Sequence, residues 1–151
     1  MLTMSNNDLT AGMYAYGQSK ARELRSNAPN MTDAEITAAE SYIPEWRAGV
    51  QKAGAPVRRS GLDQNYRTLQ THDSSANPNW TPEATPALFG IMHTTDPAKA
   101  KAWVAPFGTS GIYTLGECYK DSDGKVWRQI YEGDNDYDAV AKPDRWEIAE
   151  V

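Results

Sequence analysis

The sequence is poor in cysteine and in long apolar runs, and each shortage excludes a class of protein. Cys118 is the single cysteine, so neither an internal disulfide nor a Cys-x-x-Cys metal site can form. No apolar run approaches the roughly 18 residues of a membrane span. Residues 1–12 lack the basic start and apolar middle of a signal peptide. We therefore expect no membrane partner and no disulfide scaffold, and export would need another route.

Aliphatic side chains and phenylalanine are also scarce. Leu, Ile, Val and Phe together make up 21 of the 151 residues, a fraction low enough to raise the question of disorder. The net charge of only -5 argues against disorder, and so do the 8 Tyr and 5 Trp. Each of these rings can bury about 150–250 Å². Because Tyr and Trp also carry a polar group, they suit half-buried binding surfaces as well as cores.

The acidic balance and the lack of catalytic motifs exclude further functions. There is no basic stripe for a phosphate backbone, so nucleic acid is not an expected partner. His72 and His93 stand without a metal-ligand pattern, and we expect both to be structural. Asp134 begins a run that resembles a calcium loop, but Arg145 stands where the closing Glu should be. We expect a solvated turn there, no cofactor, no metal and no enzymatic activity.

The N-terminal residues differ in texture from the rest. Residues 7–25 place apolar side chains at helical spacing, with acidic residues first and basic residues last. Thr32 and Glu35 form a capping box ahead of a second helix, which Pro44 ends or bends. We predict that residues 1–43 are a helical attachment segment.

After Pro44 the sequence indicates a small β protein with many turns. The segment 121–124, Asp-Ser-Asp-Gly, predicts a hairpin. The predicted organisation is a first module at 44–92, a linker or short helix at 93–102, and a second module at 103–151. The fold class is thus mainly β with an N-terminal helical segment, the modules being small twisted antiparallel sheets in tandem.

An internal comparison supports two modules. In each stretch an aromatic residue is followed nine positions later by another, with a proline three positions before the second. These residues are Trp80, Pro86 and Phe89 in the first stretch and Tyr137, Pro143 and Trp146 in the second. Residues 66–69 have a counterpart in 127–130, and Gly54 has one in Gly116. Each stretch is about 45 residues long, so mutual support would be needed for stability.

Residues 46–91 resemble the small chitin- and cellulose-binding modules of carbohydrate-binding families 5 and 12. The shared pattern consists of Trp46, Gly54, Val57, Gly61, Tyr66, Arg67, Leu69, Gln70, His72, Ser74, Trp80, Pro82, Pro86, Ala87 and Leu88. The chain departs from it by two extra residues after Gly61, a longer loop before Trp80, and Phe89 in place of a closing Trp. Residues 103–148 resemble these modules less closely. Paired modules similar to these occur in structural proteins of bacteriophages and prophages.

The resemblance implies a function and a site. Trp80 would be an exposed platform on which a sugar stacks, with Tyr137 as its counterpart, and Tyr66 and Trp127 complete the candidate ligand-binding residues. Tyr66 is also expected, with Leu69, Leu88 and Phe89, to hold the first module together. The alternative for Trp80 is a half-buried turn residue that covers the segment 82–86.

Two functions follow from these expectations. The first is a non-enzymatic carbohydrate-binding protein, located in a virion or tail or outside the cell without a signal peptide. It would bind a β-linked polysaccharide or a host-surface glycan, and its N-terminal helices would contact other virion proteins. The second is a structural or decoration protein that uses the same modules for protein–protein contacts. A homo-oligomer is left open in both cases.

Overall fold

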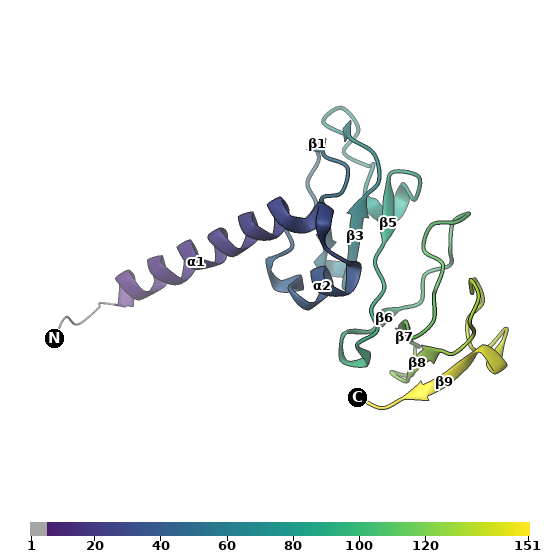
Figure 1. Ribbon diagram of the computed structural model, residues 1–151. Coiled ribbons are helices and arrows are strands. Elements are labelled where there is room, and N and C mark those ends of the chain that lie inside the picture. The colour runs from purple at the N-terminus through teal and green to yellow at the C-terminus, as the bar shows by residue number, and fades with distance from the viewer. Residues whose placement is uncertain (1–5) are drawn as a thin grey trace.

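The computed structural model describes residues 6–151, with the side chains of residue 13 and residues 15–151, as a helical part followed by small β-sheets (Figure 1). The helices are α1 (Asn6–Asn27), η1 (Ala28–Asn30), α2 (Asp33–Ala38), η2 (Glu40–Tyr42), η3 (Ser60–Leu62), η4 (Pro82–Ala84), η5 (Pro97–Lys99) and η6 (Pro143–Arg145). The strands are β1 (Val50–Gln51), β2 (Pro56–Arg59), β3 (Gln64–Thr68), β4 (His72–Asp73), β5 (Phe89–Ile91), β6 (Lys101–Ala102), β7 (Cys118–Lys120), β8 (Val126–Gln129) and β9 (Trp146–Ala149). The predicted class, mainly β with an N-terminal helical segment, is confirmed.

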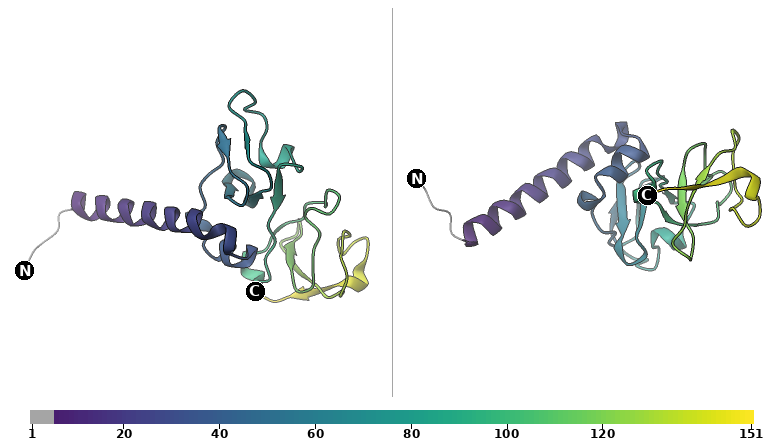
Figure 2. Two further views of the ribbon diagram at one scale, coloured as in Figure 1. Left: turned by 45° about the horizontal axis from the view of Figure 1, so that its top comes forward. Right: turned by 90° about the horizontal axis from the view of Figure 1, so that it is seen from below.

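Helix α1 extends away from the sheets, and its N-terminal end points outward (Figures 1 and 2). Met13 and Tyr16 are exposed on it, whereas Leu24, near its C-terminal end, is buried. The helix predicted for residues 7–25 is confirmed and slightly longer than expected. Residues 1–5 of the predicted attachment segment lie outside the described residues.

The C-terminal part of the helical segment is joined to the first sheet. The predicted capping box is present, because the Glu35 N–H donates to Thr32 Oγ1 at 3.2 Å while the Thr32 N–H donates to Glu35 Oε1 at 3.4 Å. Met92, just after β5, is buried in one cluster with Leu24, Ala28, Ile36 and Ile43. The helical segment therefore has a small core of its own, which Met92 connects to the first sheet.

Arg67 of β3 adds a polar connection between the sheet and the helical segment. Its guanidinium donates to the carbonyl oxygens of Ala28 and Met31, both at 2.9 Å. It also donates to Asp33 Oδ1, at 2.9 and 3.1 Å. The turn between α1 and α2 is thus fixed to the face of β3.

The strands form three sheets whose pairing is mostly antiparallel. Strands β2, β3 and β5 form the first sheet in that order, and β1 pairs with β4 in a separate two-stranded ribbon. Strands β7, β8 and β9 are antiparallel and form the second sheet, to which β6 is added in parallel. Strand β6 and η5 lie within residues 93–102, so this segment includes a sheet edge and a short helical turn. The boundaries of the two modules stay a prediction.

The two antiparallel sets have closely similar hydrogen bonding. The Gly54 N–H donates to the Thr68 carbonyl at 2.8 Å, and the Gly116 N–H donates to that of Gln129 at 2.9 Å. Thr68 lies opposite Phe89 in the first set, and Gln129 lies opposite Trp146 in the second. The sequence comparison pairs these same positions.

The hairpin predicted at 121–124 is confirmed between β7 and β8. The Gly124 N–H donates to the Asp121 carbonyl, and the Asp121 N–H donates to that of Lys125. Gly124 has a φ of +83°, which favours glycine because it has no Cβ. Asp121 Oδ1 also accepts from the backbone N–H groups of Asp123 and Lys125, which fixes the turn.

Aromatic rings make up most of the two sheet cores. Trp46, Val57, Tyr66 and Phe89 are buried together in the first, with Leu88 partly buried against them. In the second, Tyr113, Tyr119, Ala139 and Trp146 are buried, and Trp103 and Trp127 pack against them. The rings thus supply buried area that aliphatic side chains would otherwise provide.

The expectation that Leu69 helps to hold the first module together is wrong. Leu69 is 44% exposed. Thr68, the residue before it, is buried at the end of β3, and successive side chains along extended backbone point to opposite faces. Leu69 is therefore placed away from the core that contains Tyr66.

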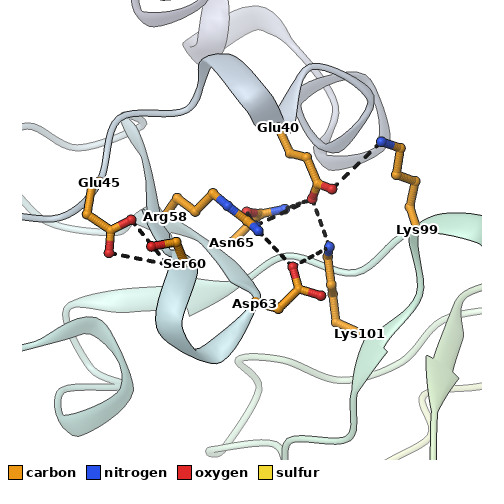
Figure 3. Close-up of polar contacts among 8 residues, drawn as sticks. All are labelled: Glu40, Glu45, Arg58, Ser60, Asp63, Asn65, Lys99 and Lys101. Carbon is orange, nitrogen blue, oxygen red and sulfur yellow. Dashed lines mark hydrogen bonds and ion pairs between the residues drawn. The ribbon is translucent and has the colours of Figure 1, made fainter. Parts of the chain in front are cut away.

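An ion-pair junction connects the helical segment, the first sheet and β6 (Figure 3). Lys101 Nζ lies 2.9 Å from Glu40 Oε2 and 2.9 Å from Asp63 Oδ1. Arg58 donates to Asp63 Oδ1 at 2.7 Å and to Asn65 Oδ1 at 2.7 Å. This junction fixes the start of the second sheet against the first.

Candidate ligand-binding site

Trp80 lies between a tight loop and the η4 turn. Its backbone N–H donates to the Asn77 carbonyl at 3.0 Å. The loop is fixed at its start by Ser74, which is buried and whose N–H donates to the Gly49 carbonyl at 2.9 Å. The Trp80 side chain is 37% exposed, so more than a third of its surface is free to meet a partner. A flat indole on a fixed loop can cover the apolar face of a sugar ring.

Tyr137 is more exposed than Trp80, but two cationic side chains of the same protein lie near its ring. It is 45% exposed. The Lys142 ammonium lies 5.4 Å from the ring centroid, and the Arg145 guanidinium lies 5.6 Å from it. A sugar stacking on Tyr137 would compete with these cation–π contacts.

Tyr131 is a neighbouring aromatic residue that the sequence comparison did not select. The Arg145 guanidinium lies 4.0 Å from its ring centroid, and Tyr131 is 42% exposed. Arg145 therefore connects Tyr131 with Tyr137 into one exposed aromatic and cationic surface. The sequence shows only that Tyr131 and Tyr137 are six positions apart. This spacing does not indicate that both rings contact Arg145.

Tyr66 and Trp127 lie at cores rather than on open surfaces. Tyr66 is only 4% exposed, and burial raises the pKa of its phenol, as does the nearby Glu83 carboxylate. Trp127 packs against the aromatic cluster of the second sheet, and its Nε1–H donates to Asp121 Oδ2 at 2.9 Å. A ligand could reach Tyr66 only through a cavity that this ring lines.

The two histidines make structural contacts. The Nδ1–H of His72 donates to the Gln70 carbonyl at 2.7 Å, and its ring meets Phe89 edge-on at 5.3 Å. His93 contacts the Gly111 carbonyl through Nε2 at 2.9 Å and stacks on Tyr113 at 3.6 Å between centroids. Burial lowers the pKa of His93, which keeps its imidazole neutral near pH 7.

Within residues 6–151, the structure contains neither a candidate metal centre nor a helix that could span a membrane. No group of three or more His, Cys, Asp or Glu side chains described there is placed to hold a metal ion. This covers the acidic run that begins at Asp134. None of the described helices combines the length and the apolar character needed to cross a bilayer.

No protein-family model matches the chain, and a search of the curated proteins finds no match. The likeness of residues 46–91 to chitin- and cellulose-binding modules therefore stays a prediction.

Proposed function

We propose that this protein is a non-enzymatic carbohydrate-binding protein that holds a β-linked polysaccharide or a host-surface glycan by aromatic stacking. The observation that carries the proposal is Trp80, an indole that is 37% exposed on a loop fixed by backbone hydrogen bonds. It stands at the position where the resembling modules place a sugar platform.

The energetics of one platform imply weak binding by a single copy. Covering one indole face removes about 80–100 Å² from water, which stabilises the complex by about 2 kcal/mol. Association itself costs several kcal/mol in lost translational and rotational freedom. The affinity per copy should therefore be millimolar to high micromolar, and useful attachment would come from many copies on one particle.

A particle such as a virion or tail supplies that multiplicity, and we place the protein there, with an extracellular location as the other option. Helix α1 extends from the sheets with Met13 and Tyr16 exposed (Figure 1). In proteins most of the stability of a helix comes from packing of its apolar side chains. The helical segment would therefore contact other virion proteins or further copies of the chain.

The second candidate is a structural or decoration protein, and the surface of the second sheet favours it. Large apolar side chains are exposed on this sheet and on the loops around it, including Leu115, Ile130, Val140 and Ile148. Exposed side chains of this kind, like the Tyr131 ring, suit protein–protein contacts. In this case the aromatic surfaces would be covered by neighbouring subunits.

Depletion of the protein from solution by insoluble chitin, cellulose and host cell wall tests the proposal. We expect Trp80→Ala to weaken binding by roughly tenfold to thirtyfold, because the lost stacking is about 2 kcal/mol. Tyr137→Ala should have a smaller effect, since Lys142 and Arg145 already contact that ring. Tyr16→Ala, which removes an exposed ring from α1, is the matched control and should bind as wild type does.

Two outcomes would count against the proposal. Unchanged binding of Trp80→Ala would remove Trp80 from the site. Failure of the wild type to bind any of the three polysaccharides would favour the structural candidate.

A further inference from the structure

A groove of about 710 Å³ lies where the end of α1 meets the segment that contains β1. Arg25 and Pro29 line it from α1 and η1, and Arg47, Val50 and Lys52 line it from the segment around β1. Every described residue on the lining lies between positions 25 and 57. The groove is therefore separate from the Trp80 platform and from the second sheet.

The floor of the groove is apolar and fixed. Trp46, Pro56 and Val57 line it and are buried, whereas Val50 is 65% exposed. The Trp46 N–H donates to the Arg58 carbonyl at 2.9 Å, which joins the floor to β2. An apolar side chain of another molecule would remove Val50 from water if it entered here.

The rim carries three cationic side chains that the protein leaves without carboxylate partners. Arg25, Arg47 and Lys52 are exposed, and none of them belongs to an ion pair within the described part of the chain. Glu45 also lines the groove, but its carboxylate accepts from the Ser60 N–H at 3.1 and 3.2 Å. We call this site the basic groove, because its lining has more cations than carboxylates.

The negative charge of the chain is concentrated after residue 102. Residues 103–151 contain ten acidic and five basic side chains, and their net charge of -5 equals that of the whole chain. Glu132, Asp134 and Asp136 are exposed and have no ion pair with another described residue. The loop that carries them is fixed, because Asn135 is buried and exchanges two backbone hydrogen bonds of 3.1 Å with Tyr113.

Val140 follows this acidic loop on a turn that is fixed as well. Its side chain is 90% exposed. The preceding Ala139 is buried, and its N–H donates to the Tyr119 hydroxyl at 3.0 Å. The Lys142 N–H donates to the Asp138 carbonyl at 2.9 Å and closes the turn. We call residues 138–142 the valine turn; a turn held in this way loses little conformational freedom when it meets a partner.

We propose that the basic groove binds the valine turn of a second copy of this chain. Val140 would lie against the apolar floor, and the carboxylates of residues 132–138 would lie beside Arg25, Arg47 and Lys52. The two surfaces are complementary in charge and each combines an apolar centre with charged neighbours, the arrangement that gives an interface its register and specificity.

A single chain does not fill its own groove. The lining includes no described residue of the second sheet, and α1 and the second sheet lie on different sides of the first sheet in all views (Figures 1 and 2). Because the groove and the turn are different surfaces, each copy that binds leaves one groove and one turn free. Such a heterologous contact produces rows or closed rings of copies.

This inference goes beyond the proposed function and does not depend on it. A row or ring of copies would bring several Trp80 platforms together, which is the multiplicity that weak stacking requires. The contact itself uses no residue of the platform, so Trp80→Ala should self-associate as the wild type does.

Sedimentation velocity of the full chain tests the inference. At low salt we expect the sedimentation coefficient to rise with protein concentration, as copies associate. At about 0.5 M salt the association should be about tenfold weaker, because the Debye length then falls well below 10 Å and exposed ion pairs are screened.

Two variants and their matched controls locate the contact. Arg47→Glu reverses a charge on the rim, and Val140→Arg brings a cation to a cationic groove, so each should weaken association by at least about tenfold. Lys120→Glu and Val151→Arg make the same changes at exposed positions outside both surfaces and should associate as the wild type does. All four positions are exposed, so the variants should fold, and amide spectra verify this.

An equimolar mixture of the two disrupting variants provides the sharpest test. Val140→Arg keeps an intact groove, and Arg47→Glu keeps an intact turn. The mixture should therefore form dimers with roughly the affinity of the wild-type contact, although neither variant associates by itself. A loss caused by misfolding would not be restored by mixing.

The remaining outcomes overturn the inference. A wild type that stays monomeric at about 1 mM and low salt would exclude the contact. Association that persists in both variants, or a mixture that stays monomeric, would assign self-association to another surface such as α1. A monomer whose Arg47 and Lys52 amide signals shift with polygalacturonate would assign the groove to an anionic polysaccharide instead. Self-association without glycan binding would contradict only the proposed function.

Discussion

Lys101 is the residue on which the junction between the two sheets most depends. Its side chain is 10% exposed and contacts carboxylates from the helical segment and from the first sheet. Burial alone raises the pKa of Glu40, but hydrogen bonds from Lys101 and Asn65 and the nearby charges hold it below its ordinary value. The pKa of Asp63 is lowered in the same way, against burial, by Arg58 and Lys101.

These lowered pKa values predict how stability depends on pH. A carboxyl group whose pKa is lower in the folded state stabilises that state above its ordinary pKa of about 4. The contribution is lost as the pH falls through the lowered value in the folded protein. Lys101→Met should reduce the free energy of unfolding by about 1–3 kcal/mol at pH 7, because it leaves Glu40 with fewer partners. The difference from wild type should shrink below about pH 4.

Urea unfolding of both proteins between pH 3 and pH 7 measures this. Lys120→Met is the control, because Lys120 is exposed on β7, and it should change stability by less than about 0.5 kcal/mol. A loss for Lys101→Met that is as large at pH 3 as at pH 7 would show that its ion pairs are not responsible.

Among the elements, the helical segment has two parts with different roles. The outer part of α1 extends from the sheets, whereas Leu24 of its C-terminal part, Ile36 of α2 and Ile43 after η2 are buried with Met92. Arg67 also donates hydrogen bonds to carbonyl and carboxylate oxygens between α1 and α2. The segment is therefore an attachment candidate at one end and part of a core at the other.

Two truncations distinguish these roles. Removal of residues 1–20 keeps Leu24 and should leave the melting temperature within a few degrees of wild type. Removal of residues 1–43 exposes Met92 and leaves Arg67 without the partners described above, so the first sheet should unfold or aggregate. Thermal unfolding followed by circular dichroism and amide spectra measures both. A 1–43 deletion that retains the spectrum of the first sheet would show that the helices only attach the protein.

Elements with a local cause could be predicted from the sequence. The capping box at Thr32 and the Asp-Gly turn before Lys125 depend on a few neighbouring residues, and both are present. The parallel pairing of β6 with β7 could not be predicted, because its partners are separated by an intervening loop. Leu69 is exposed because alternation along the strand decides which face it lies on, and the likeness to known modules does not show this alternation.

The candidate site also combines features that could be predicted from the sequence with features that could not. Trp80 could be chosen from the resemblance of residues 46–91 to known modules. The cavity lined by Tyr66 could not, because its walls meet only when residues far apart in sequence are brought together by the junction at Lys101. One signal available in the sequence was Phe107, which lines this cavity and is one of only two phenylalanines.

In the whole molecule, α1 extends from the region that holds the sheets (Figure 2). Under the proposed role, this helix would attach the protein and the sheet region would contact the glycan. A single indole platform gives weak affinity, so the proposed role depends on several copies acting together. The proposed role nevertheless depends on the Trp80 ring, because several copies can only strengthen a contact that each copy makes.

Intermolecular nuclear Overhauser effects between the protein and a soluble β-linked N-acetylglucosamine oligomer show whether a sugar ring lies on Trp80. We expect cross-peaks from the ring C–H protons of the sugar to the indole protons of Trp80, and their loss in Trp80→Ala while the fold is kept. Cross-peaks that reach other aromatic residues but never Trp80, or none at millimolar oligomer, would contradict it.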